Sequence, residues 1–167
     1  MNTLNGLPVH VLLVHAVVVL LPLSALLLIL TAVSPTIRHR LAGANALLAL
    51  AVVALVPLTT SAGEWLEHHV ASTPDIRRHT ELGDTAIWAA IPVALVALVI
   101  WWRQRETRPA TQRRTWLHPT SRTATRLIAV VAVVVAGIAV VDVYKIGDSG
   151  AKASWEGKVS SAPLIAG

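Results

Sequence analysis

The chain contains no cysteine, and its only methionine is Met1. The lack of cysteine excludes disulfide bonds, thiolate metal sites and catalysis by a thiol. The lack of an internal methionine removes thioether ligands for copper or haem iron. Histidine and carboxylate side chains are therefore the candidate ligands for any metal or cofactor.

Charged side chains are also scarce in this chain. They make up 14% of the 167 residues, whereas soluble domains carry about a quarter. Hydrophobic residues make up 54% and are concentrated in long runs of Ala, Val and Leu. We therefore expect the lipid bilayer to be the medium in which this protein folds.

The basic excess of the chain does not indicate a nucleic-acid-binding protein. The net charge is +5, and seven of the 14 basic residues lie within the short segment 103–126, between two apolar runs. Such a segment is typical of a cytoplasmic loop at a membrane surface rather than of a segment that binds in a groove of a nucleic acid. We therefore expect no nucleic-acid partner.

The apolar runs predict an all-α fold, an integral membrane four-helix bundle. The first run, from Val9 to Val33, has no charged side chain and would extend about 37 Å as a helix, enough to span a bilayer. The chain is expected to form one domain with an extracytoplasmic tail at 145–167 and helices at about 8–33, 41–68, 80–103 and 123–144.

The connecting segments predict the orientation of the bundle. Residues 34–40 form an expected basic turn, and residues 103–126 are richer still in arginine. Both belong on the cytoplasmic side, which would leave both termini outside the cytoplasm. Gly147-Asp148-Ser149-Gly150 indicates a turn that folds the tail back over the outer ends of the helices.

This orientation gathers histidines near the outer face. A histidine within a membrane run is costly unless its ring is bound, so His15 suggests a ligand or proton role. The simpler alternative is a structural histidine paired with Asp84 or Glu64. Haem ligation by two imidazoles needs histidines on different helices. We expect His15 and His79 as axial ligands of a b-type haem, with two substitutes: His10 and His68.

A divalent metal is the alternative ligand of this face. Glu64 and His68 are four residues apart and share a helix face, so with His69 they could chelate an ion such as zinc. The same spacing more often marks a solvated face. Further charged groups are candidates to orient imidazoles or relay protons: Glu64, Glu81, Asp84, Asp142, Lys145 and Asp148.

Asp142 is the most costly of these carboxylates, because it lies where the last apolar run ends. A carboxylate at such a depth is expected to have a partner. Lys145, Lys152 and a protonated histidine are the candidates.

Several motifs resemble a known family. The stretch Gly6-Leu7-Pro8-Val9-His10-Val11-Leu12-Leu13-Val14-His15 resembles the opening signature of the bacterial membrane family called domain of unknown function 2231. Three further segments are similar to other marks of that family: Gly63-Glu64-Trp65-Leu66-Glu67-His68, His79-Thr80-Glu81-Leu82-Gly83-Asp84 and Gly147-Asp148-Ser149-Gly150-Ala151-Lys152.

The resemblance implies a four-helix protein of the bacterial cytoplasmic membrane. Some relatives are fused to Rieske iron–sulfur or c-type cytochrome domains, which implies a redox role. Together these lines give the leading hypothesis: a haem-binding electron-transfer component linked to the quinone pool or to a respiratory or extracytoplasmic redox protein. The alternative is a non-redox accessory protein whose outer cluster binds a divalent metal or a partner subunit. We expect no independent enzyme activity, and homo-oligomerisation stays open.

Overall fold

The computed structural model describes residues 3–4, 6–106 and 121–156. A two-stranded antiparallel hairpin, β1 (Thr3–Leu4) and β2 (Leu7–Pro8), precedes the helices and turns at Gly6, whose φ of 80° suits glycine. The helices are α1 (Val9–Val33), α2 (Pro35–Glu67), α3 (Pro74–Gly83), α4 (Ala86–Glu106) and α5 (Arg122–Trp155).

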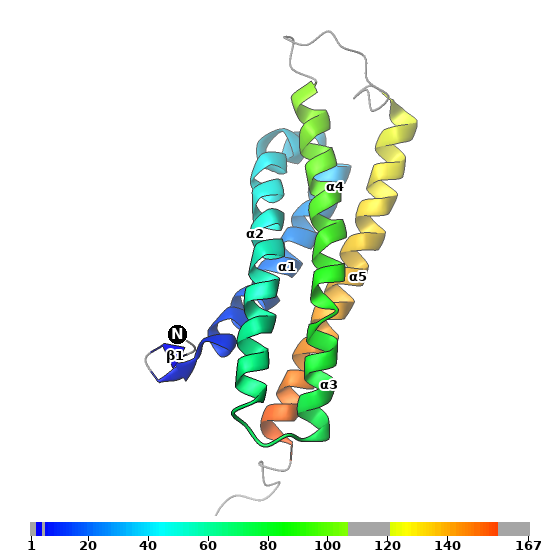
Figure 1. The fold of residues 1–167 in the computed structure, drawn as a ribbon. Coiled ribbons are helices and arrows are strands. Elements are labelled where there is room, and N and C mark those ends of the chain that lie inside the picture. The colour runs from blue at the N-terminus through cyan, green and yellow to red at the C-terminus, as the bar shows by residue number, and fades with distance from the viewer. Residues whose placement is uncertain (1–2, 5, 107–120, 157–167) are drawn as a thin grey trace, which may run out of the picture.

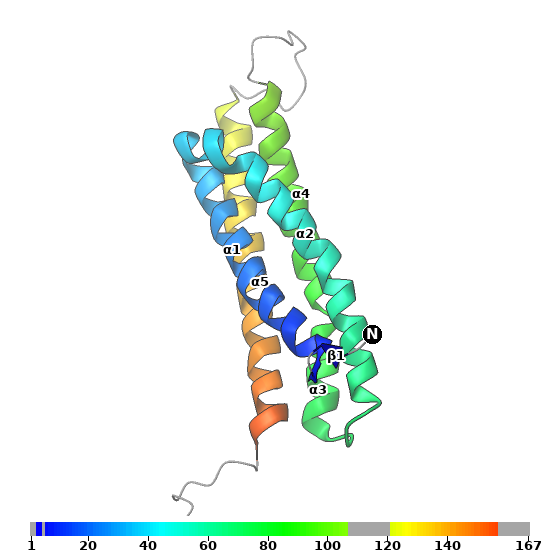
Figure 2. The same cartoon turned by 90° about the vertical axis from the view of Figure 1, so that its left-hand side faces the viewer.

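The helices form an up-and-down bundle (Figures 1 and 2). Helix α1 packs beside α2 and α5, and α4 closes the ring by packing against the same two helices. Helix α3 extends α4 and packs against the end of α5. The described residues contain four helical segments long and apolar enough to cross a membrane: α1, α2, α3 with α4, and α5. The expected all-α membrane bundle is confirmed.

Many alanines lie at the centre of the bundle together with a few larger residues such as Leu28 and Val93, and many other large apolar side chains face outward. The most deeply buried residues include Ala25, Ala49, Ala90, Ala132 and Ala139. The exposed apolar residues include Val19, Leu47, Leu95 and Ile138. Lipid tails are as apolar as these outer side chains, so helices in a bilayer associate by close backbone packing over small residues. The distribution is therefore that of a bundle with lipid around it.

The first two helices are separated by a single residue, so the expected turn over 34–40 is wrong. Ser34 ends α1, and its hydroxyl accepts a 3.4 Å hydrogen bond from the backbone N–H of Ile37. Pro35 follows at the first position of α2, where its missing N–H costs nothing. Ser34 is thus a helix N-cap, and α2 begins six residues before the expected boundary at 41.

The third span is divided. Thr73 caps α3 by accepting a 3.2 Å hydrogen bond from the N–H of Ile76, and α3 then runs from Pro74 to Gly83. Helix α4 begins at Ala86, so the helical region starts before the expected boundary at 80. The extra turns carry His79 and lie beside the end of α5.

The last helix does not turn at Gly147–Gly150, so that prediction is wrong. Helix α5 continues through this segment to Trp155. Ser149 is buried within the extension, and Gly150 lies against the ring of His79. Packing against α3 therefore outweighs the turn preference of the two glycines. Most of the expected tail, 157–167, lies outside the described residues.

Candidate functional site

His10 is held at the beginning of α1 by a contact with α2. Its Nδ1 donates a 2.9 Å hydrogen bond to the backbone carbonyl of Thr59. A carbonyl oxygen only accepts, so this nitrogen carries the proton. In the neutral ring, Nε2 therefore holds the lone pair.

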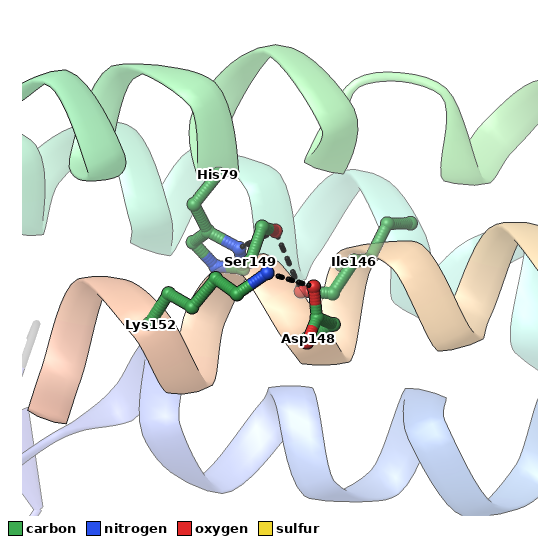
Figure 3. A network of polar contacts seen from close by, with 5 residues as sticks. All are labelled: His79, Ile146, Asp148, Ser149 and Lys152. Atoms are coloured by element: carbon green, nitrogen blue, oxygen red, sulfur yellow. Dashed lines mark hydrogen bonds and ion pairs between the residues drawn. The ribbon is translucent and has the colours of Figure 1, made fainter. Parts of the chain in front are cut away.

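His79 is held in a similar way between α3 and α5 (Figure 3). Its Nδ1 lies 3.1 Å from Oγ of Ser149. The same hydroxyl donates a 2.8 Å hydrogen bond to the carbonyl of Ile146, so toward the imidazole it acts as an acceptor. His79 therefore also carries its proton on Nδ1 and its lone pair on Nε2.

The two rings lie close together in an edge-to-face arrangement. Their centroids are 6.2 Å apart, and their planes meet at 73°. Two glycines make this placement possible. A methyl group at position 63 would lie 2.9 Å from Cε1 of His10, and one at position 150 would lie 2.9 Å from Cε1 of His79. His10 and His79, with Gly63 and Gly150 beside them, are called here the histidine pair.

Hydrogen bonds to Nδ1 orient both rings of the histidine pair. Ligating histidines commonly donate their second ring N–H to a carbonyl, a carboxylate or another oxygen, which fixes the tautomer and the ring orientation. His10 does so to Thr59, and His79 does so to Ser149. The side-chain hydrogen bonds described for both rings are made through Nδ1, and the backbone of Ile146 also interacts with the ring of His79. Two lone-pair nitrogens from two helices therefore lie at one end of the bundle.

The other candidate histidines lie elsewhere. His15 is exposed on α1, and its Nδ1 donates to the carbonyl of Val11 in the same helix. His68 is exposed at the end of α2. His69 donates to the carbonyl of Trp65 at 2.7 Å and stacks on that indole with ring centroids 4.0 Å apart. It is thus His10, the expected substitute, that lies beside His79.

The expected carboxylate cluster is spread over the surface. Four of the candidate charged residues outside the apolar spans are exposed, namely Glu64, Glu81, Asp84 and Lys145. Asp148 is also exposed and forms a 2.9 Å ion pair with Lys152. Among the described residues, no three or more His, Asp or Glu side chains are grouped so that they could hold a metal. Glu64, His68 and His69 are therefore not assembled into a three-ligand site here.

Asp142 takes a hydroxyl partner instead of the expected cation. Thr85 donates a 2.8 Å hydrogen bond to Oδ1 of Asp142, and Oδ2 is buried with no hydrogen-bond partner among the described residues. Lys152, one of the expected partners, is paired with Asp148. Asp142 thus connects the beginning of α4 to α5.

Comparison with known proteins agrees with this architecture. The family model described as "Predicted membrane protein (DUF2231)" matches residues 6–163. The chain belongs to this family. No curated protein and no solved structure gives a significant match. The DUF2231 match covers nearly the whole chain, including the histidine pair and both glycines.

Some residues of the site were not identified from the DUF2231 motifs. Gly63 and Gly150 each belong to a quoted motif, yet neither was expected to make room for an imidazole. Thr59 contributes only its carbonyl, which no residue type signals. Ser149 was placed at the outer face, but as part of a turn. Gly63 and Gly150 lie far along the chain from the rings that they contact, so no local sequence pattern indicates this packing.

Proposed function

We propose that this protein is a membrane redox component in which His10 and His79 would hold a b-type haem on the extracytoplasmic side. One observation carries the proposal: two imidazoles from different helices lie beside each other, each with Nδ1 engaged in a hydrogen bond. Imidazole pairs of this kind are the ligand set of low-spin haem in helical bundles.

The closeness of the two rings supports a shared metal. Bonds from a metal to imidazole nitrogens are about 2.0–2.1 Å long, so two rings that hold one metal must lie close together. The observed separation is 6.2 Å. This short separation supports the proposal, and the edge-to-face rings would have to turn their Nε2 atoms toward a shared metal.

The chain's own residues would orient the ligands and limit their motion. Thr59 and Ser149 would hold the two tautomers, and Gly63 and Gly150 would let α2 and α5 approach the rings. A bound haem would supply one-electron transfer, with its potential set by these ligands and their hydrogen bonds. The electron partner would be a quinone in the bilayer or an extracytoplasmic redox protein.

A second candidate is a bare transition-metal ion, such as zinc, in a non-redox accessory protein. The tight packing of the rings against positions 63 and 150 favours it, because a small ion needs less space than a macrocycle. Two imidazoles would supply two positions of the ion, and water or a partner subunit would supply the others.

Absorption spectra of matched variants test the proposal. The protein would be produced with haem supplied, purified in detergent, and measured as a reduced-minus-oxidised spectrum. We expect the sharp α-band of low-spin haem, its loss in His10→Ala and in His79→Ala, and its retention in His15→Ala and His68→Ala. Circular dichroism would check that each variant is folded.

Other outcomes would contradict the assignment. Loss of the band in His15→Ala with retention in His10→Ala would move the ligand from His10 to His15. A folded protein that stays colourless after haem addition would exclude the haem proposal. Stoichiometric zinc in that colourless protein, lost in His10→Ala and His79→Ala, would establish the second candidate.

A further inference from the structure

A second polar feature lies at the opposite end of the bundle from the histidine pair. A cavity of about 270 Å³ opens among α1, α2, α4 and α5. Its polar lining residues are Arg38, His39, Arg103, Gln104 and Thr125. Apolar side chains complete the lining, including Ile100 and Ile128. We call this cavity the arginine pocket.

Arg38 is fixed in the pocket by the end of α1. Its Nε donates a 2.8 Å hydrogen bond to the carbonyl of Thr31, and its Nη2 donates a 2.5 Å hydrogen bond to the carbonyl of Ala32. These carbonyls belong to the last turn of α1, where helices lack intrahelical donors and carry partial negative charge. The guanidinium is therefore positioned before any ligand arrives.

Arg103 presents a second guanidinium to the same cavity, and its side chain is 6% exposed. Its Nη2 donates a 3.2 Å hydrogen bond to Oγ1 of Thr125 on α5. Arg38 and Arg103 are close enough to repel each other, and Glu106 is the acidic side chain whose charge acts on Arg103. Bringing two guanidinium groups to one cavity costs free energy. Glu106 and the other partners of Arg103 offset part of that cost, and an anion bound by both guanidinium groups would offset more of it.

We propose that the arginine pocket binds a phosphate group, and that an anionic phospholipid headgroup supplies it. Arginine forms forked hydrogen bonds that match phosphate oxygens, and basic pockets between membrane helices bind lipid headgroups. A volume of about 270 Å³ accommodates a headgroup phosphate. The apolar side of the pocket, at Ile100 and Ile128, suits the beginning of the acyl chains. This site is separate from the histidine pair and does not depend on haem.

Lipid-dependent thermal stability tests the proposal. The full chain would be placed in nanodiscs of phosphatidylcholine alone, or of phosphatidylcholine with phosphatidylglycerol, and Tm compared between the two for each variant. We expect phosphatidylglycerol to raise Tm of the wild type. The increase should disappear in Arg38→Gln and Arg103→Gln, with lipid binding about tenfold weaker. Comparing lipids within one variant removes general effects of the substitution on stability.

The control is Arg40→Gln, which removes the same charge from an exposed position two residues after Arg38. It should keep the full increase. If Arg103→Gln does not fold, Arg38→Lys provides a second test. It keeps the charge but loses the paired N–H donors of the guanidinium, so it should retain only part of the Tm increase. The proposed lipid site would be excluded by an equal phosphatidylglycerol-dependent Tm increase in all variants. It would also be excluded if Arg40→Gln lost this increase as fully as Arg38→Gln.

Inorganic phosphate distinguishes the two sources of the anion. We expect phosphate added in a neutral detergent to leave Tm unchanged, and native mass spectrometry to show co-purified phosphatidylglycerol that is absent from Arg38→Gln. A Tm increase with phosphate alone that is lost in Arg38→Gln would support the phosphate site but overturn the lipid headgroup as its source.

Discussion

The hydroxyl of Thr85 lies 2.8 Å from Oδ1 of Asp142 and 2.7 Å from the carbonyl oxygen of Leu82, so two acceptors share its single proton. Seven residues further along α5, Ser149 contacts His79. Positions seven apart lie on one face of a helix, so both contacts connect the α3–α4 segment to the same face of α5. Helix α5 is therefore held by polar contacts at two levels beyond its apolar run.

Replacing Thr85 by valine should destabilise the bundle by about 1–3 kcal/mol. Valine preserves the shape of threonine but removes the hydroxyl donor of Oδ1, and Oδ2 of Asp142 already has no partner among the described residues. The free energy of unfolding in mixed micelles measures the effect. Thr60→Val is the control, because the Thr60 hydroxyl bonds only to Pro57 of its own helix. Equal losses in the two variants would contradict the role of the Thr85–Asp142 contact.

Alanine at position 150 should displace His79, whereas alanine at position 147 should not. The new methyl group would lie 2.9 Å from Cε1 of His79 at position 150, but would meet nothing within 4 Å at position 147. We expect Gly150→Ala to lose about 1–3 kcal/mol of stability. Gly147→Ala should gain up to about 1 kcal/mol from its higher helix propensity. Thermal unfolding measures both, and the absence of a difference would refute the close packing.

A second pair of glycine-to-alanine variants tests the packing of His10, the other ring of the histidine pair. Gly63→Ala should shift the ring of His10, because its methyl group would lie 2.9 Å from Cε1 of that ring. Gly83→Ala, where the methyl group has open space, is the control. Histidine proton and carbon chemical shifts in detergent report ring position directly. Unchanged His10 shifts in Gly63→Ala would show that the ring does not contact this backbone.

A buried polar contact between α1 and α2 should contribute measurable stability. Ser24 donates a 3.1 Å hydrogen bond to Oδ1 of Asn45, and both side chains are fully buried. Such contacts in membrane bundles couple by about 0.6 kcal/mol on average, up to about 1.7. A double-mutant cycle of Ser24→Ala and Asn45→Ala isolates the pair from other contacts of each residue. Additive effects of the two substitutions would exclude a direct coupling.

The four spans could be predicted because the charged residues mark their ends. Between Val9 and Val33 no charged residue interrupts the run, and the physical requirement for a spanning helix is mainly one of length and polarity. The exact ends of the helices were harder to predict from the sequence. Ser34-Pro35 suits a turn and a helix start equally well, and the contact of Ser34 with Ile37 decides for the helix start.

The histidine pair could be predicted only in part. His10 and His79 were both candidates, but which histidine lies beside His79 depends on the rotation of α1 about its axis. Composition does not determine that rotation. His15 lies on the exposed face of α1, so His10 is the histidine brought to α3. Gly150 was misinterpreted for a related reason: its missing side chain leaves space for a ring instead of allowing a turn.

The length of α5 determines from where the histidine pair can be reached. A helix of 34 residues extends about 51 Å, well beyond a hydrocarbon layer of about 30 Å. Ser149 lies about 10 Å past Asp142 along this helix, and α3 lies beside it at the same level (Figures 1 and 3). An ion or cofactor could therefore be delivered to His79, or removed by a chelator, from the aqueous phase while the bundle stays embedded. Under the proposed function, a ligand would thus reach the histidine pair without passing through the membrane.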